Sequence, residues 1–463
     1  MNAIRRSVPL LFLWCALPAL AVDDGRVLRD SLPPEVPDLI TLYTQALRDS
    51  PSIVGALAAS EAARQGEAAA KGQLLPQVGV FGEAAYVDER IRGDFFGLAD
   101  IDREQDFERF IYGLGIEQAV LRPSLWADLD RSRLIKLRTD LAEREARSRL
   151  ASQLMERYLG VLEAVEVKTA AEARVDAVTN QQKQVDSRVE AGLLTRADQS
   201  QAEASASLAR VQASMAESEV AASVARLRST ANWTSRSLQG LTEDFTFILP
   251  QPLDEAFWVE RAAANSLLVL NQEIELALAQ LELKRTQRGR WPTVDLFGSA
   301  TQLDTGGGVE GERDQRDMRI GARARMPLFS GGSISAAIAA QEAAAILAQS
   351  ELDQLRTDAR LAAATAYRQV VVGRSQLTAL QQAVDASRIA EVEFRIGFEA
   401  GRRTNADMLS ATERRFFAEV ELQRRRYRQL VEALTLKQVA GTVGPEDIKQ
   451  LNRLLVRPVV IPF

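Results

Sequence analysis

Residues 190–202 read EAGLLTRADQSQA and residues 399–411 read EAGRRTNADMLSA, so both stretches share the frame E-A-G-x-x-T-x-A-D-x-x-x-A. Each lies between two long segments with helical spacing. Gly192 and Gly401 can adopt the left-handed conformation that ends an incoming helix. We therefore expect the chain to turn back on itself twice, in the same way.

The same frame also contains the start of the outgoing helix. Thr195 and Thr404 stand where an N-cap is needed, and Asp198 and Asp407 follow three residues later, which is the spacing of a capping box. In this local interpretation the two carboxylates serve only to cap helices.

The composition excludes several classes of protein. Among 463 residues there is no His, which removes the most common general base and zinc ligand. No nucleophile elbow, P-loop or supported pair of acids occurs either, so we expect no enzyme activity, cofactor or metal site. The 57 Lys and Arg against 63 Asp and Glu leave no basic surface for nucleic acid.

Residues 1–21 have the pattern of a secretory signal peptide, with a basic start, an apolar run and the triplet ALA ending at Ala21. The bulky Trp14 before Cys15 disfavours lipidation of that Cys. Beyond this segment no run of eighteen apolar residues predicts a transmembrane helix. An exported chain of this kind would enter a membrane as β-strands.

The two turns belong to a tandem repeat. Residues 292–298 match residues 76–82, and in each half a helical segment precedes two alternating segments, a long Ala-rich helix and a return helix. We expect a mainly α fold with a β-barrel contribution. The predicted boundaries are a signal peptide at 1–21; a first repeat at 22–250, with strands at about 76–91 and 107–121 and long helices at about 124–190 and 195–232; a second repeat at 251–441, with strands at about 292–303 and 317–328 and long helices at about 333–398 and 404–440; and a tail at 442–463.

The last alternating segment indicates what the strands face. Arg319, Arg323 and Arg325 fall on one side of it, and Met318 and Ile320 on the other. A row of Arg cannot face lipid, so we expect it to line a water-filled lumen. The alternative is the solvated face of an ordinary half-buried sheet, but the flanking helices lack a broad apolar stripe to cover it.

Four strands cannot close a barrel alone, because about eight is the smallest number that closes around a filled interior. Open strand edges are not tolerated in lipid. The chain is therefore expected to share its barrel with copies of itself, and three copies would supply twelve strands.

This combination resembles the TolC family of outer-membrane efflux and type I secretion channel proteins. The resemblance rests on the order of elements, MPLFSGG at 326–332, the repeated turn and AGTVGPEDIKQLNRLL at 440–455. It implies a homotrimer with a twelve-stranded barrel in the outer membrane of a Gram-negative bacterium and an α-helical tunnel in the periplasm. It also implies contact with outer-membrane lipid, and as partners a periplasmic adaptor (membrane fusion) protein and an inner-membrane transporter, either ABC-type or proton-driven.

The resemblance further implies a passive duct that is gated at the turns. Asp198 and Asp407 match acidic entrance positions of the family, and Arg403, next to Arg402, matches a position that links helices. The turn residues expected to dock the adaptor are Gly192, Leu193, Thr195, Gly401 and Thr404.

Two positions depart from the family pattern. Ser410 stands at a second acidic position, so the negative ring should be thinner. Phe398 replaces a linking Tyr, so one hydroxyl bond of the closed state is missing.

Two choices stay open. The rival function is a periplasmic coiled-coil structural or adaptor protein without a pore, which the alternating strands argue against. Within the channel class, the sequence does not choose between drug efflux and one-step protein secretion.

Overall fold

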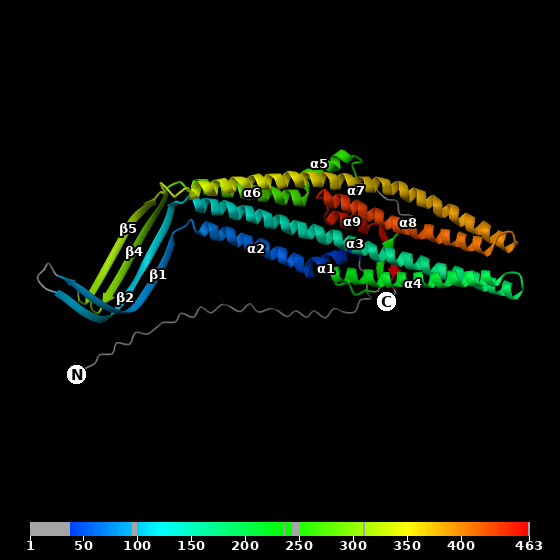
Figure 1. Cartoon of the computed structure of the whole chain (residues 1–463), viewed down its shortest axis with the longest axis horizontal. Coiled ribbons are helices and arrows are strands. Elements are labelled where there is room, and N and C mark those ends of the chain that lie inside the picture. The colour runs from blue at the N-terminus through cyan, green and yellow to red at the C-terminus, as the bar shows by residue number, and fades with distance from the viewer. Residues whose placement is uncertain (1–37, 95–99, 236, 243–250, 309–310, 462–463) are drawn as a thin grey trace, which may run out of the picture. The chain divides into compact units, whose positions relative to one another are not determined.

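Long helices and a four-stranded antiparallel sheet make up most of the chain (Figure 1). This computed structural model describes residues 38–461 apart from 95–99, 236, 243–250 and 309–310. All of them belong to one unit, Val36–Phe463. The predicted signal peptide, 1–21 with Cys15, lies outside the described residues.

The order of elements confirms the predicted repeat. The first half contains α1 (Leu39–Asp49), α2 (Pro51–Gly72), β1 (Gln77–Asp94), β2 (Asp100–Leu121), α3 (Pro123–Glu190) and α4 (Arg196–Ala231). The second half contains α5 (Glu255–Asn265), α6 (Leu267–Arg288), β4 (Thr293–Thr305), β5 (Arg313–Arg325), α7 (Ser333–Glu399) and α8 (Asn405–Val439). The remaining elements are β3 (Ser237–Leu241), α9 (Pro445–Asn452) and β6 (Leu455–Val460).

The sheet joins the two halves in the order β1-β2-β4-β5, with every neighbouring pair antiparallel. Its central joint is therefore β2 with β4, one strand from each half. The outer strands β1 and β5 each have one edge that pairs with no other strand among the described residues. Figure 1 shows α2, α3, α6 and α7 leading from the strand ends.

The first hairpin is longer than the sequence indicated. Its ladder runs from Gln77 opposite Glu117 to Asp94 opposite Asp100, so it includes residues that lie between the two predicted strands, 76–91 and 107–121. Ion pairs between the strands extend it, since Arg90 Nη2 lies 3.2 Å from Asp102 Oδ2 and Arg92 Nε lies 3.4 Å from the same oxygen. Charged side chains can continue a two-stranded ladder that is exposed to water.

The last strand lies earlier than predicted. β5 begins at Arg313, four residues before the predicted start, and ends at Arg325, so Met326 to Leu328 do not belong to it. Pro327 explains the early end, because Pro has no N–H to donate to a ladder.

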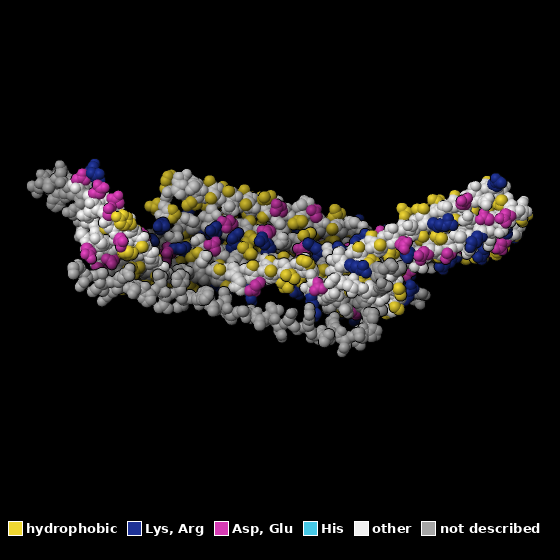
Figure 2. Space-filling view, turned by 90° about the horizontal axis from the view of Figure 1, so that it is seen from below, with side chains coloured by type: hydrophobic (Ala, Val, Ile, Leu, Met, Phe, Trp, Pro, Cys, Tyr) yellow, Lys and Arg dark blue, Asp and Glu magenta, His cyan; other side chains and the backbone are white. Residues whose placement is uncertain are grey.

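The long helices form two hairpins that pack side by side. α3 packs against α4 and α8, and α7 packs against α8, while α2 and α6 lie against the parts of α3 and α7 that follow the sheet. No described helix combines the length and the apolar character needed to cross a bilayer. Figure 2 shows hydrophobic side chains along the helices among charges of both signs.

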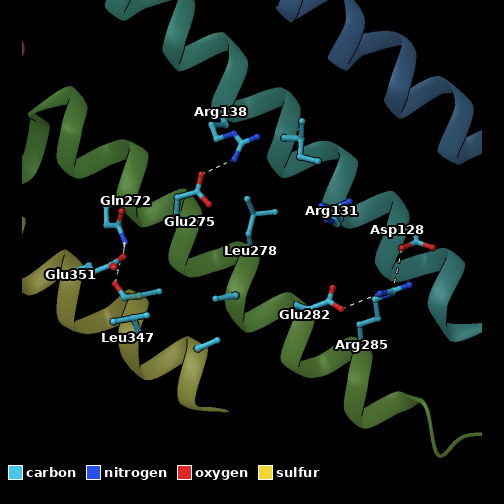
Figure 3. A pocket seen from close by; sticks show the side chains of 14 residues that line it. Asp128, Arg131, Arg138, Gln272, Glu275, Leu278, Glu282, Arg285, Leu347 and Glu351 are labelled. Atoms are coloured by element: carbon cyan, nitrogen blue, oxygen red, sulfur yellow. Dashed lines mark hydrogen bonds and ion pairs between the residues drawn. The ribbon is translucent and has the colours of Figure 1, made fainter. Parts of the chain in front are cut away.

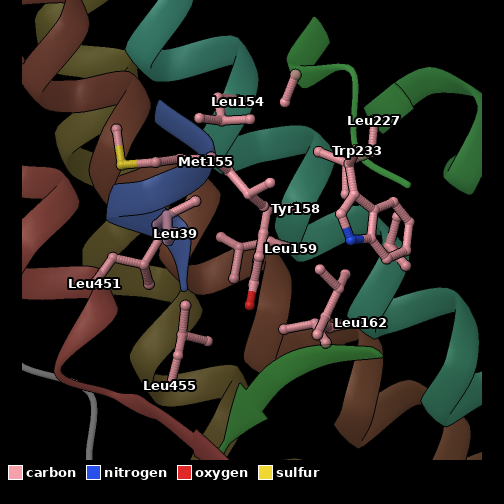
Figure 4. Packing of buried hydrophobic residues seen from close by; sticks show 14 of the residues in the cluster. Leu39, Leu154, Met155, Tyr158, Leu159, Leu162, Leu227, Trp233, Leu451 and Leu455 are labelled. Atoms are coloured by element: carbon pink, nitrogen blue, oxygen red, sulfur yellow. The ribbon is translucent and has the colours of Figure 1, made fainter. Parts of the chain in front are cut away.

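The largest core surrounds the middle of α3, where α1, α4, α8 and α9 meet β3 and β6 (Figure 4). Tyr158 is fully buried there, and its hydroxyl donates to Gln239 O at 2.7 Å and accepts from Gln239 N at 2.9 Å. Burial raises the pKa of this hydroxyl. No sequence pattern predicted β3, which pairs with β6 from the tail.

A glycine lets polar side chains enter the interface between α7 and α8. A Cβ on Gly373 would overlap Nη2 of Arg425 and Oε1 of Gln429, both of which are buried. Gln429 donates to Val370 O at 2.8 Å and accepts from Arg425 at 2.7 Å, and Arg425 Nη1 also donates to Glu432 at 3.0 Å. The network pairs most of the polar groups that the interface buries, and Nε of Arg425 is left without a partner.

Candidate functional site

The two turns have the same backbone geometry. Gly192 has a φ of 73° and Gly401 a φ of 71°, both left-handed. The next N–H groups reach back five residues, from Leu193 to Arg188 O and from Arg402 to Gly397 O, each at 2.8 Å. These bonds satisfy carbonyl groups that the helix end would otherwise leave free.

Both outgoing helices start with the predicted capping box. Thr195 N donates to Asp198 Oδ2 at 3.0 Å, and Thr404 N donates to Asp407 Oδ2 at 3.1 Å. In return the hydroxyl of each Thr accepts from the backbone N–H of its Asp. The local role of both carboxylates is thereby confirmed.

Asp407 is also held in its ionised form. Hydrogen bonds from the backbone and hydroxyl of Thr404 lower the pKa of its carboxyl group, and Arg403 contributes in the same direction. The carboxylate is half-buried and not enclosed, so it keeps access to solvent.

The first residue of each outgoing helix distinguishes the turns. Arg196 is exposed, whereas Asn405 at the matching position is fully buried. Asn405 Nδ2 donates to Asp198 O at 3.2 Å, and its Oδ1 accepts from Gln181 at 3.1 Å. Asn405 therefore ties the second turn to the first. Sequence reasoning missed it, and only a comparison of the two first-turn positions could have drawn attention to it.

Phe398 lies inside a small apolar core at the turns. It is 2% exposed and packs with Val185, Ala202 and Met408. The Cζ of Arg188 lies 4.4 Å from the ring centroid, and Arg188 Nη1 donates to Phe398 O at 3.2 Å. Apolar burial and a cation–π contact thus hold Phe398, which has no hydroxyl group to form a hydrogen bond here.

The remaining predicted turn residues differ in their contacts. The Cζ of Arg403 lies 4.6 Å from the ring centroid of Phe394, and the absence of a side chain at Gly397 leaves room for its stem. The guanidinium of Arg402 has no hydrogen bond or ion pair within the described chain, and Leu193 is 73% exposed. Ser410 is half-buried on α8.

The sheet has one apolar face, and this face is open. Pairing places alternate residues of the four strands on it, and their large side chains are all exposed: Val78, Val80, Tyr86, Phe110, Tyr112, Leu114, Ile116, Leu296, Met318 and Ile320. Ile320 is 93% exposed and Met318 is 82% exposed. A folded water-soluble sheet covers such a face, so something outside the chain must cover it.

The opposite face is polar. It carries Arg319, Arg323 and Arg325 on β5, with Asp295 on β4 and Arg122 after β2. Arg122 Nη2 lies 2.6 Å from Asp295 Oδ2, and the Cζ of Arg323 lies 5.1 Å from the ring centroid of Phe297. The predicted row of Arg therefore shares one face, opposite the apolar one.

Known proteins resemble the chain in sequence and in fold. The profile of the outer membrane efflux protein family matches residues 258–442. The outer membrane protein TolC of Escherichia coli is 24% identical over 433 residues, which covers 91% of this chain and 86% of TolC. The proteases secretion protein PrtF of Dickeya chrysanthemi is 24% identical over 417 residues, covering 89% and 90% of the two chains. The structure of the Campylobacter jejuni CmeC outer membrane channel superposes with a TM-score of 0.76 at 14% identity, covering 90% of this chain and 89% of CmeC.

The chain belongs to the TolC family of outer-membrane efflux proteins. The predicted resemblance and fold class are confirmed, and the chain is a channel protein of the efflux and type I secretion class, not an enzyme. As an outer-membrane efflux protein it resides in the outer membrane, with a helical domain in the periplasm. The rival reading, a periplasmic adaptor without a pore, is thereby set aside.

This efflux protein also has a charged groove between α3, α6 and α7 (Figure 3). The groove measures about 660 Å³ and is bordered by cross-helix ion pairs. Arg138 Nη1 lies 2.7 Å from Glu275 Oε1, and Arg285 Nε lies 3.4 Å from Asp128 Oδ1. Among the described residues no group of His, Cys, Asp or Glu is placed to hold a metal ion.

Proposed function

We propose that three copies of the chain assemble into one exit duct. Their twelve strands would close a barrel in the outer membrane, and their helices would continue it as a tunnel through the periplasm. A substrate of a tripartite efflux or type I secretion system would leave the cell through it without chemical change.

The exposed apolar face of the sheet carries this proposal. Contact with lipid is favourable for ten large apolar side chains that are exposed on one face of a sheet. Lipid also excludes free strand edges, so β1 and β5 require partners. Copies of the same chain supply both edges at once, and closure then places Arg319, Arg323 and Arg325 toward water in the lumen.

The outer helices of the two hairpins support the same assembly. Leu208, Val211 and Met215 on α4 are exposed, as are Ile389 and Val392 on α7. α3 and α8 form the inner contact between the hairpins within the chain. The apolar sides of α4 and α7 are therefore free to pack against neighbouring copies.

We assign the gate and the docking of partners to the turns. A periplasmic adaptor would contact the exposed turn residues, and an inner-membrane transporter, ABC-type or proton-driven, would complete the system. Asp198 and Asp407 would add negative charge at the entrance, with Arg402, Arg403, Phe398 and Ser410 around it. The bond from Asn405 to the first turn supports a closed state in which the two turns move together.

The assembly is tested by amine cross-linking and by conductance. Purified protein should yield trimers that resist SDS and conduct ions in planar bilayers. Folded trimers that never conduct would overturn the duct.

The charge of the entrance can be separated from helix capping. Asp198→Asn and Asp407→Asn keep an oxygen that can accept the capping bond but remove the negative charge, whereas the Ala variants remove both. If the carboxylates ring the entrance, multivalent cations should block the Asn double variant less than the wild type. Unchanged block in both double variants would leave capping as their only role.

A further inference from the structure

We propose that β5 of one copy pairs with β1 of the next in a single register, in which Arg323 lies directly opposite Glu83 of the neighbouring copy. The inference rests on the proposed closure of the sheet by copies of the chain. It names the contact that would make that closure specific.

The first step is that both hairpins share one register. Phe81 pairs with Gly113 in the first hairpin, and Phe297 pairs with Gly321 in the second. In both, a Cβ on the glycine would lie 2.9 Å from the Cζ of the paired Phe, so each ring lies over its glycine. Residues of β1 and β4 therefore correspond at an offset of 216, and those of β2 and β5 at an offset of 208.

The second step uses the joint between the halves. β2 pairs with β4 within the chain, with Gly115 opposite Ser299. In a closed ring of repeats, β5 takes the place of β2, and β1 of the next copy takes the place of β4. The pairing of β5 with that β1 should therefore have the same register as the pairing of β2 with β4. Adding 208 to Gly115 gives Arg323, and subtracting 216 from Ser299 gives Glu83.

The side chains at this new joint are complementary. Arg323 forms no ion pair within the described residues, because Asp295, opposite it on β4, is bound by Arg122, and its guanidinium stacks on Phe297. The side chain of Glu83 is 62% exposed, and its one ion pair among the described residues is a long one, with Arg109 Nη2 lying 3.8 Å from Glu83 Oε1. Opposite charges directly across an antiparallel pair attract. The same register places Arg325 opposite the ring of Phe81, which allows a second cation–π contact.

Two pairs in this register are unfavourable by themselves, because Asp317 would face Glu89 and Arg316 would face Arg90. The charge of Arg90 is already balanced within the chain, since its Nη2 lies 3.2 Å from Asp102 Oδ2. Arg319 forms an ion pair with Asp317 in the chain and supplies the missing positive charge. A shift of one residue is excluded, since it would turn the apolar face inward. A shift of two would place Arg325 or Gly321 opposite Glu83, so these two positions define the controls.

Cysteine pairs test the register directly. E83C with R323C should form a disulfide between copies under mild oxidation and give covalent oligomers that a reductant reverses. Within one chain the two positions lie on the outer strands, three strand spacings or about 14 Å apart, which is too far for a disulfide. The control pairs, E83C with R325C and E83C with G321C, should link at least tenfold less.

The outcomes separate the register from the assembly. Suppose that amine cross-linking shows trimers but that a control pair links best or that none of the pairs links. The register is then wrong, and the proposal of a trimeric duct is unaffected. If wild-type protein gives no trimer, the proposed function fails first.

Charge reversal gives a second readout. E83R should lower the temperature at which SDS dissociates the trimer, and E83R with R323E should restore it. A double variant no more resistant than E83R would overturn the contact.

Discussion

At the scale of single residues, Asn405 joins two turns that are otherwise built alike. Asn405→Ala should remove the bond to the carbonyl of Asp198 and leave the buried amide of Gln181 without its Asn405 partner. An unsatisfied buried group costs about 1–3 kcal/mol, which corresponds to roughly 5- to 150-fold faster hydrogen exchange in the second turn. Arg196→Ala is the matched control, because Arg196 holds the same position and is exposed. Equal exchange in both variants would contradict the link.

Asp407 gives the second turn a dependence on pH. Its pKa is lowered from the usual 3.8, so its carboxylate stabilises the cap fully above that value and loses this effect as the pH falls through the folded pKa. Exchange at residues 400–410 should therefore be flat from pH 7 to about 5 and rise below about pH 3.8. Asp407→Asn has no carboxyl group to protonate, so the same acid step in that variant would count against this cause.

At the scale of elements, the glycine of the turn can be tested with a pair of substitutions. A Cβ on Gly401 or on Gly66 would meet nothing within 4 Å, but only Gly401 has a positive φ. Gly401→Ala should destabilise the turn by about 1–2 kcal/mol, because an L-residue is strained there. Gly66→Ala in α2 should stabilise its helix by about 0.5–1 kcal/mol. Thermal unfolding with local exchange measures both, and equal effects would exclude φ as the cause.

These elements also show what the sequence reveals. Gly192, Gly401 and the Thr–Asp spacing act locally, so the turns and the order of the repeat were predictable. The ends of the strands were harder to predict, because the ladder is extended by a contact between Arg90 and Asp102 on different strands. β3 could not be predicted for the same reason. It is stabilised by β6 and by the hydroxyl of Tyr158, which are more than eighty residues away in sequence.

The site was predictable to the same extent. The capping roles of Asp198 and Asp407 follow from sequence spacing alone. The role of Asn405 depends on a contact with another hairpin, and no period or motif records that contact.

At the scale of the whole molecule, the face of the sheet decides where the chain can reside. Ile320→Lys places a charge on the apolar face and should cost about 2–4 kcal/mol in lipid. Thr301→Lys on the opposite face is the control, because that side meets water. Fractionation should show less Ile320→Lys protein in the outer membrane and unchanged Thr301→Lys protein. Equal recovery of both would contradict the assignment of the faces.

The contact at Gly373 limits how α7 and α8 can move against each other. Arg425 and Gln429 of α8 occupy the space that a side chain at Gly373 of α7 would fill. Sliding α8 by one turn along α7 would press them against a residue that has a side chain. The two helices can therefore rotate about this contact more easily than they can slide. The turn at Gly401 lies 28 residues from Gly373, which is about 42 Å along the helix. A tilt of only a few degrees at Gly373 would therefore move the turn by several ångströms, and the proposed opening would require little rearrangement in the middle of the chain.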